Sequence, residues 1–206
     1  MNLNHDRKAI TLFFNPFVYI AGTKALFIGL GGLLLAGLVG SLCNTHFDGV
    51  LDTHTGAHVA LWGFLSEGII DWLCLAAVLL FCGMLVSKTA FRIIDVVGTQ
   101  ALARWPTIFI SLATLPKGYQ RFTSYLIESF LKPGAKAGFN AADAVIFCAV
   151  VIVMIPLIIW MVFLMYKAYS VSCNVKGGKA VGTFIAGLIV AEILSKLALY
   201  WLLKLT

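Results

Sequence analysis

The chain has 206 residues, of which 61% are hydrophobic and 12% charged, and its formal net charge is +6. Soluble domains carry about 25% charged residues, so this composition excludes an ordinary water-soluble fold. Within a bilayer, backbone polar groups are satisfied by α-helices or by closed β-barrels. Continuous apolar runs of about 20 residues favour helices over short alternating strands. The sequence therefore predicts an all-α, polytopic transmembrane bundle.

Five apolar segments in chain order are predicted to span the membrane. They cover about 25–43, 68–87, 92–115, 144–166 and 180–203. Residues 1–24 form a short amphipathic lead whose aromatic stretch suits the membrane interface, and residues 25–206 form a single transmembrane domain. Two spans carry small residues at four-residue spacing, which lets another helix approach closely. These predicted packing faces consist of Gly32, Ala36 and Gly40, and of Thr183, Gly187 and Ala191.

The third segment, 92–115, has an ambiguous pattern. It is interrupted by Asp95, Gln100, Arg104 and Pro106, so hydropathy alone leaves open whether it spans. With five spans and a cytoplasmic N-terminus, eight Lys and Arg lie inside and five outside; with four spans, three lie outside. The positive-inside rule by itself therefore favours four spans over five.

Several ionisable residues lie within or beside the predicted spans. A charge at the bilayer centre costs about 2.5–3.5 kcal/mol on insertion scales, so each needs a partner or a wet cavity. Glu192 and Lys196 have the favourable i,i+4 order, and Arg104 is expected to reach Asp71 or Glu192 across helices. We favour structural ion pairing, with Arg104 and Asp95 near the interface. The alternative is a proton or ion path.

The connection over residues 44–58 gathers candidate metal ligands. Imidazole and carboxylate groups of this kind bind divalent cations when they converge. However, the segment is rich in turn residues and matches no zinc spacing, so the favoured interpretation is a hydrated external loop without a metal. An intramembrane enzyme would need His46, Asp48 and His54 to meet within hydrogen-bond reach. The candidates are His46, Asp48, Asp52, His54 and His58.

The sequence carries no established catalytic or cofactor-binding pattern. It has no GxSxG, HExxH or P-loop motif, and its five cysteines form no CxxC pair. We therefore expect a protein that is not an enzyme, with no catalytic residues, no cofactor and no nucleic-acid partner.

The order of several short motifs resembles the Yip family, the five-span membrane proteins that interact with Ypt and Rab GTPases, in its short bacterial form. A motif precedes the first span, a basic turn leads into a helix that breaks in its middle, and a tyrosine-containing motif precedes the Gly/Ala-rich final helix. These are Asn15-Pro16-Phe17 with Tyr19 and Lys24; Lys88 to Arg92 followed by Arg104-Trp105-Pro106; and Tyr166-Lys167-Ala168-Tyr169 followed by Ala180 to Lys204.

This resemblance implies five spans, with a cytoplasmic N-terminus and the C-terminus on the opposite side of a bacterial inner membrane. Eukaryotic members bind Rab GTPases and have a long acidic N-terminal region. Residues 1–24 are mostly basic or apolar here, so GTPase binding is not carried over. The expected role is membrane organisation, scaffolding or lipid handling, in contact with the bilayer and with a membrane protein or a second copy. The alternative is a small transporter or channel component in which Asp71, Arg104 and Glu192 line a polar path.

Overall fold

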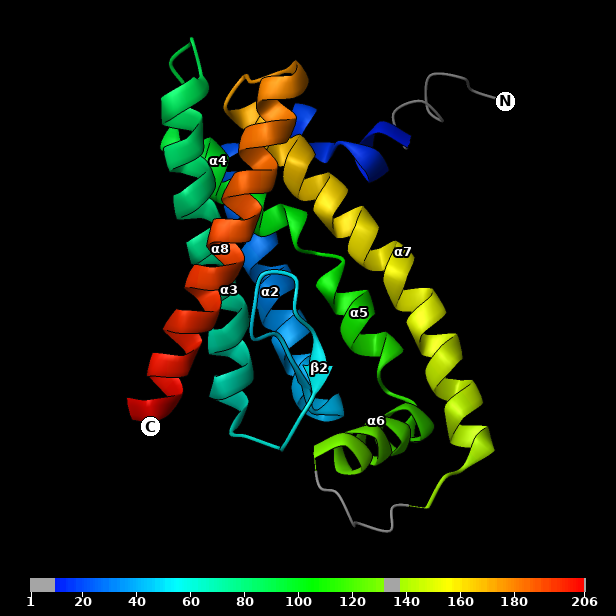
Figure 1. The fold of residues 1–206 in the computed structure, drawn as a ribbon. Helices are drawn as coiled ribbons and strands as arrows, with labels where there is room; N and C mark the ends of the chain where they lie inside the picture. The colour runs from blue at the N-terminus through cyan, green and yellow to red at the C-terminus, as the bar shows by residue number, and fades with distance from the viewer. Residues whose placement is uncertain (1–9, 132–137, 206) are drawn as a thin grey trace, which may run out of the picture.

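The computed structural model describes residues 10–131 and 138–205, which fold into a helical bundle with one short β-hairpin (Figure 1). Residues 1–9 of the predicted lead lie outside the described part, and residues 10–14 are helical. In chain order the elements are η1 (Pro16–Val18), α2 (Gly22–Cys43), β1 (Thr45–His46), β2 (His54–Thr55), α3 (Leu61–Val86), α4 (Ile93–Ala103), α5 (Thr107–Ala113), α6 (Lys117–Leu131), α7 (Ala141–Ser172) and α8 (Gly177–Leu205).

Four described helices are long and apolar enough to cross a membrane, which confirms an integral membrane protein. They are α2, α3, α7 and the Gly177–Leu202 part of α8, with mean hydropathies of 1.8 to 3.1 over their most apolar windows. Each helix is longer than its predicted span, and α3 begins at Leu61 rather than near residue 68. The outer face of α7 is strongly apolar, with Ile152 70% and Ile159 64% exposed, as expected of a surface that contacts lipid.

The third predicted segment forms two helices, α4 and α5, separated by a break at residues 104–106. Pro106 cannot donate a backbone hydrogen bond, so the helix stops and restarts around it. Together, α4 and α5 follow α2 in the same direction. Gly98 lies against the Gly22 end of α2, and the Thr114 hydroxyl meets that of Thr45 at the other end, 2.5 Å away. Over residues 10–131 and 138–205 the chain therefore makes five passes through the bundle, one of them broken.

The connections place the two ends of the described chain at opposite ends of the bundle (Figure 1). Helices α2, α4–α5 and α8 run one way, and α3 and α7 run the other. Helix α6 lies across the end at which α7 begins, where the Arg121 guanidinium binds the Asp143 carboxylate at 2.5 Å. At the opposite end of the bundle, α4 contacts the last residue of α7 through a 2.8 Å hydrogen bond between the Thr99 and Ser172 hydroxyls.

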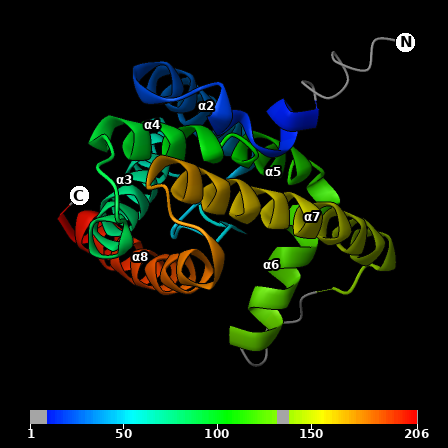
Figure 2. The same ribbon diagram turned by 90° about the horizontal axis from the view of Figure 1, so that it is seen from above.

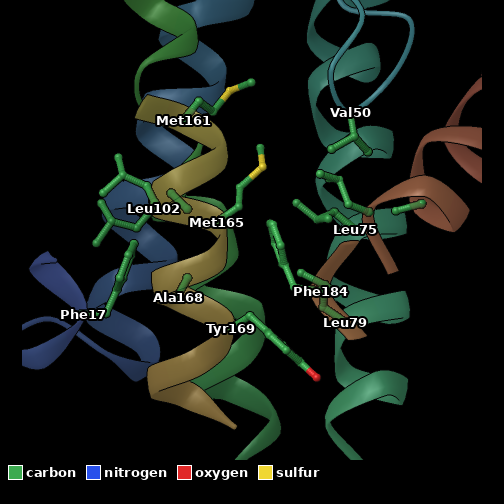
Figure 3. Packing of buried hydrophobic residues seen from close by; sticks show 14 of the residues in the cluster. Phe17, Val50, Leu75, Leu79, Leu102, Met161, Met165, Ala168, Tyr169 and Phe184 are labelled. Carbon is green, nitrogen blue, oxygen red and sulfur yellow. The ribbon is translucent and has the colours of Figure 1, made fainter. Parts of the chain in front are cut away.

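The main hydrophobic core lies between α7, α3 and α8. Figure 3 shows Met165 and Tyr169 of α7 directed toward Leu75 and Leu79 of α3 and Phe184 of α8. These side chains are almost completely buried. Unbranched Met and aromatic side chains fill the irregular space where helices diverge. This core joins α7 and α8 to α3.

The predicted small-residue faces pack within the chain. Gly32 faces Trp105, and the Ser111 hydroxyl donates to the Ala36 carbonyl at 3.3 Å. Gly40 lies near the same Ser111 side chain. A Cβ at Gly29 would lie 2.4 Å from the backbone of Ala101, so the backbones of α2 and α4 are in near contact there.

The second face lies on α8. Its Thr183 hydroxyl meets the Tyr169 hydroxyl at 2.9 Å, Gly187 approaches the side chains of Leu79 and Cys82 on α3, and Ala191 is fully buried. Both small-residue faces therefore bring neighbouring helices of the same chain together.

The 44–58 connection is not the hydrated external loop that the sequence analysis favours. Strands β1 and β2 pair antiparallel, Thr45 with Thr55 and His46 with His54, and the residues between them fold back between the helices (Figures 1 and 2). Phe47 is 5% and Val50 1% exposed. Irregular backbone at membrane depth is tolerated where protein covers it, and the surrounding helices provide that cover. We call residues 44–58 the re-entrant hairpin.

Candidate functional site: an ionic network around the re-entrant hairpin

The deepest part of the site is an ion pair between α3 and the α4–α5 break. The Arg104 Nη2 atom lies 3.3 Å from Asp71 Oδ2, and Arg104 Nη1 donates to the Val50 carbonyl at 3.3 Å. The two charged side chains are 1% and 0% exposed. The predicted contact between Arg104 and Asp71 is confirmed. The helix break turns the Arg104 guanidinium toward the hairpin tip inside the bundle, and its position near the membrane interface stays a prediction.

A second set of contacts joins α8 to the hairpin. The Glu192 carboxylate accepts the backbone N–H of Leu51 at 2.8 Å, and its other oxygen is 3.5 Å from the Lys196 ammonium. Lys196 also pairs with Asp52. The predicted i,i+4 pair is therefore present, and both of its members also contact the hairpin. A Cβ at Gly49 would lie 2.4 Å from Glu192 Oε1, so a side chain at this position would meet the carboxylate.

A third contact ties the base of the hairpin to α3 through Glu67. One oxygen of Glu67 lies 2.7 Å from His46 Nδ1, and the other accepts the Phe47 N–H at 2.9 Å. His46 Nε2 is 2.9 Å from the Ala57 carbonyl, which can accept but not donate. Both imidazole nitrogens therefore face acceptors, which favours the doubly protonated ring. The hydrogen bond to Glu67 accordingly raises the pKa of His46 above its ordinary value.

Glu67 is a site residue that was not among the predicted candidates. Its signal was nevertheless present, because a carboxylate stands four residues before Asp71, inside an apolar stretch that extends into α3. Side chains with this spacing share one face of a helix. Glu67 therefore lies one turn before Asp71 on the same face of α3, where Glu67 contacts the hairpin and Asp71 contacts Arg104.

The outer part of the site holds three of the five candidate metal ligands. One ligand atom each from Asp48, Asp52 and His54 lie within 4.8 Å of one another, and His54 Nδ1 is 3.2 Å from Asp48 Oδ1. His46 lies beside them, with its ring centre 5.7 Å from that of His54, but both its nitrogens are engaged. His58 is elsewhere, against Asn44. These groups are of the type that binds a divalent cation. However, the Asp52 carboxylate already forms an ion pair with the Lys196 ammonium.

The network as a whole is rich in acid. It contains five carboxylates, two permanent cations and two histidines, so protonation of both histidines leaves one negative charge (five against four). Among the described residues, five buried side-chain atoms have no hydrogen-bond partner, and three of them belong to the network: Asp48 Oδ1, Asp71 Oδ1 and Arg104 Nε. The arrangement can act chemically in two ways. It can hold the hairpin by charge pairing, or it can accept a proton or a cation.

Comparisons with protein-family models, with curated proteins and with solved structures found no match. The resemblance to the Yip family therefore rests on the sequence motifs alone.

Proposed function

We propose that this protein is a non-enzymatic, five-span membrane protein of the Yip type. It organises the membrane through contacts with lipid and with other membrane proteins, as a scaffold or lipid-handling bundle. Its N-terminus lies on the cytoplasmic side of a bacterial inner membrane. The broken α4–α5 pass crosses the bilayer despite its charges. The opposite placement of the two ends of the described chain supports this topology.

The observation that carries the proposal is the inward pairing of the intramembrane charges. Asp71 and Arg104 neutralise each other with almost no exposure, and Glu192 is tied to a backbone N–H of the hairpin. A buried pair of this kind is destabilising to break, but it does not by itself add stability over apolar residues. Its effect is to specify one arrangement of the hairpin. The outer faces of α7 and α8 are left apolar for contact with lipid and with other proteins.

Reconstitution into proteoliposomes tests this role. Copies labelled with donor and acceptor fluorophores at an introduced Lys176→Cys should show energy transfer above the random level. An excess of unlabelled copies should lower that transfer, and proton or cation flux should not exceed that of protein-free vesicles. A random level of transfer together with measurable flux would overturn the proposal. Cys148 is exposed and Cys74 and Cys82 are partly exposed, so all three should be replaced by Ser to make the label report one site.

The second candidate is a proton or cation path, and the unpartnered buried atoms of Asp71 and Arg104 favour it. The acid excess of the network would then serve to bind the transported ion. In that case Glu192→Gln, which keeps an acceptor for Leu51 but removes a charge, should abolish flux. Lys88→Gln, an exposed change far from the network, should leave the flux unchanged.

A further inference from the structure

An apolar groove lies on the outer surface of α7, beneath the helical residues 10–14. It has a volume of about 720 Å³ and is lined by Phe13, Phe14 and seven residues of α7 between Ile152 and Phe163. We call it the α7 groove. Its α7 wall belongs to the most apolar of the four span-capable helices, with a mean hydropathy of 3.1 and 17% of its window buried. Such a surface is solvated by lipid.

The aromatic roof of the groove is fixed to its floor. The Phe13 ring stacks on Trp160 with ring centres 4.2 Å apart, and the Trp160 indole N–H donates to the Phe13 carbonyl at 3.3 Å. Phe14 meets Phe163 edge-on at 6.3 Å. Trp160 is also held from behind by Trp105, 4.7 Å away. The groove is therefore preformed, so a ligand would bind without first ordering its walls.

A positively charged side chain, that of Lys167, lies one helical turn beyond the groove. The Lys167 ammonium is 5.1 Å from the centre of the Phe163 ring and 6.0 Å from that of Tyr166. None of the ion pairs found among the described residues involves Lys167. Cation–π contact positions this ammonium without neutralising it. Its positive charge therefore remains available to an anion at the mouth of an apolar groove.

We propose that the α7 groove binds an anionic phospholipid, with an acyl chain between the aromatic roof and α7 and the phosphate at Lys167. The charge complements the membrane. Lys167 lies in the last turns of α7, and Asn174, just after that helix, donates to the Thr89 hydroxyl at 3.1 Å in the turn that carries Lys88 and Arg92. The positive-inside rule assigns this basic turn to the anionic cytoplasmic leaflet. An uncharged transmembrane helix of a partner would also fill the apolar groove, but it would leave the Lys167 ammonium without an anion. This inference rests on the proposed lipid-contact role and names its lipid class.

Trp160 is a built-in reporter of groove occupancy. Nanodiscs would contain phosphatidylglycerol or phosphatidylcholine with brominated acyl chains, which quench tryptophan at contact. The Trp160 signal is taken as the difference between the unmodified chain and Trp160→Phe. At equal mole fraction, we expect brominated phosphatidylglycerol to quench with an apparent affinity about fivefold higher, the preference that one lysine confers at an anionic surface.

Matched variants separate headgroup from acyl-chain recognition. Lys167→Gln should equalise the two lipids, whereas Lys88→Gln at the same end of the bundle should leave the preference unchanged. Val153→Phe, which fills the groove, should weaken quenching by both lipids. Ile155→Phe, exposed on the same helix outside the lining, should not. Helical circular dichroism verifies that each variant is folded.

Equal quenching by both lipids in the unmodified chain, or an unaltered response of Val153→Phe, would overturn this site. If the unmodified chain shows no phosphatidylglycerol preference but energy transfer between its copies is intact, the result counts against the lipid site alone. Retained preference without energy transfer would count against the proposed scaffolding alone.

Discussion

Removing Arg104 is the sharpest test of how the re-entrant hairpin is held. In Arg104→Met, Asp71 remains buried without its partner, and the Val50 carbonyl loses its donor. Breaking a buried ion pair by removing one member costs about 3–5 kcal/mol, and we expect the free energy of unfolding to fall by this amount. The measurement is a reversible SDS titration in mixed micelles, followed by far-ultraviolet circular dichroism.

The double variant Asp71→Leu/Arg104→Met provides the control. Removing both charges eliminates the buried unpaired carboxylate, so the remaining loss is the hydrogen bond to Val50, about 1–3 kcal/mol. The double variant should therefore be more stable than either single variant. If the two single effects simply add, or if Arg104→Met costs less than about 1 kcal/mol, the pair does not hold the hairpin and the reasoning is refuted.

Three further outcomes are expected. Gly29→Ala should lower the free energy of unfolding by about 1–3 kcal/mol, because its Cβ would meet the Ala101 backbone at 2.4 Å, while Gly31→Ala, with open space around it, should be close to neutral in the same titration. The raised pKa of His46 means that the folded state holds the proton more tightly than the unfolded state, so this stabilisation is complete below the ordinary pKa and is lost as pH rises through the raised value. His46→Gln should reduce the fall in Tm between neutral and alkaline pH, whereas His58→Gln, whose partner Asn44 lies outside the network, should not. Alkaline phosphatase fused after Thr206 should be active in the periplasm, since five spans put that end outside, and a cytoplasmic C-terminus would contradict the five-span topology.

The location of the charged residues could be predicted more easily than their depth. Hydropathy marked Asp71, Arg104 and Glu192 as exceptional, because each interrupts or borders an apolar run. Arg104 and Glu192, however, also bind backbone groups of a hairpin that was expected to be an external loop. Phe47 and Val50 were the available signal, since two apolar side chains in a polar segment are better satisfied in the bundle than in water.

The metal hypothesis illustrates the same limit. Spacing alone grouped five residues between 46 and 58, but the hairpin register directs His46 to Glu67 and separates His58 from the rest. Strand pairing decides which side chains share a face, and a two-residue ladder is too short to predict from sequence pattern. Glu67 was missed because its role depends on what lies opposite α3.

By itself, the sequence determined the solvent of this protein, its helical class and four of its membrane spans, because the free energy of placing an apolar residue in lipid depends on local composition. The tertiary structure decided how the third segment breaks, where the hairpin lies and which charges pair. Those contacts join residues 33, 54 and 141 positions apart, for Arg104 with Asp71, Arg104 with Val50 and Glu192 with Leu51. Pairing at such separations arises when helices pack, and no local property of the chain specifies it.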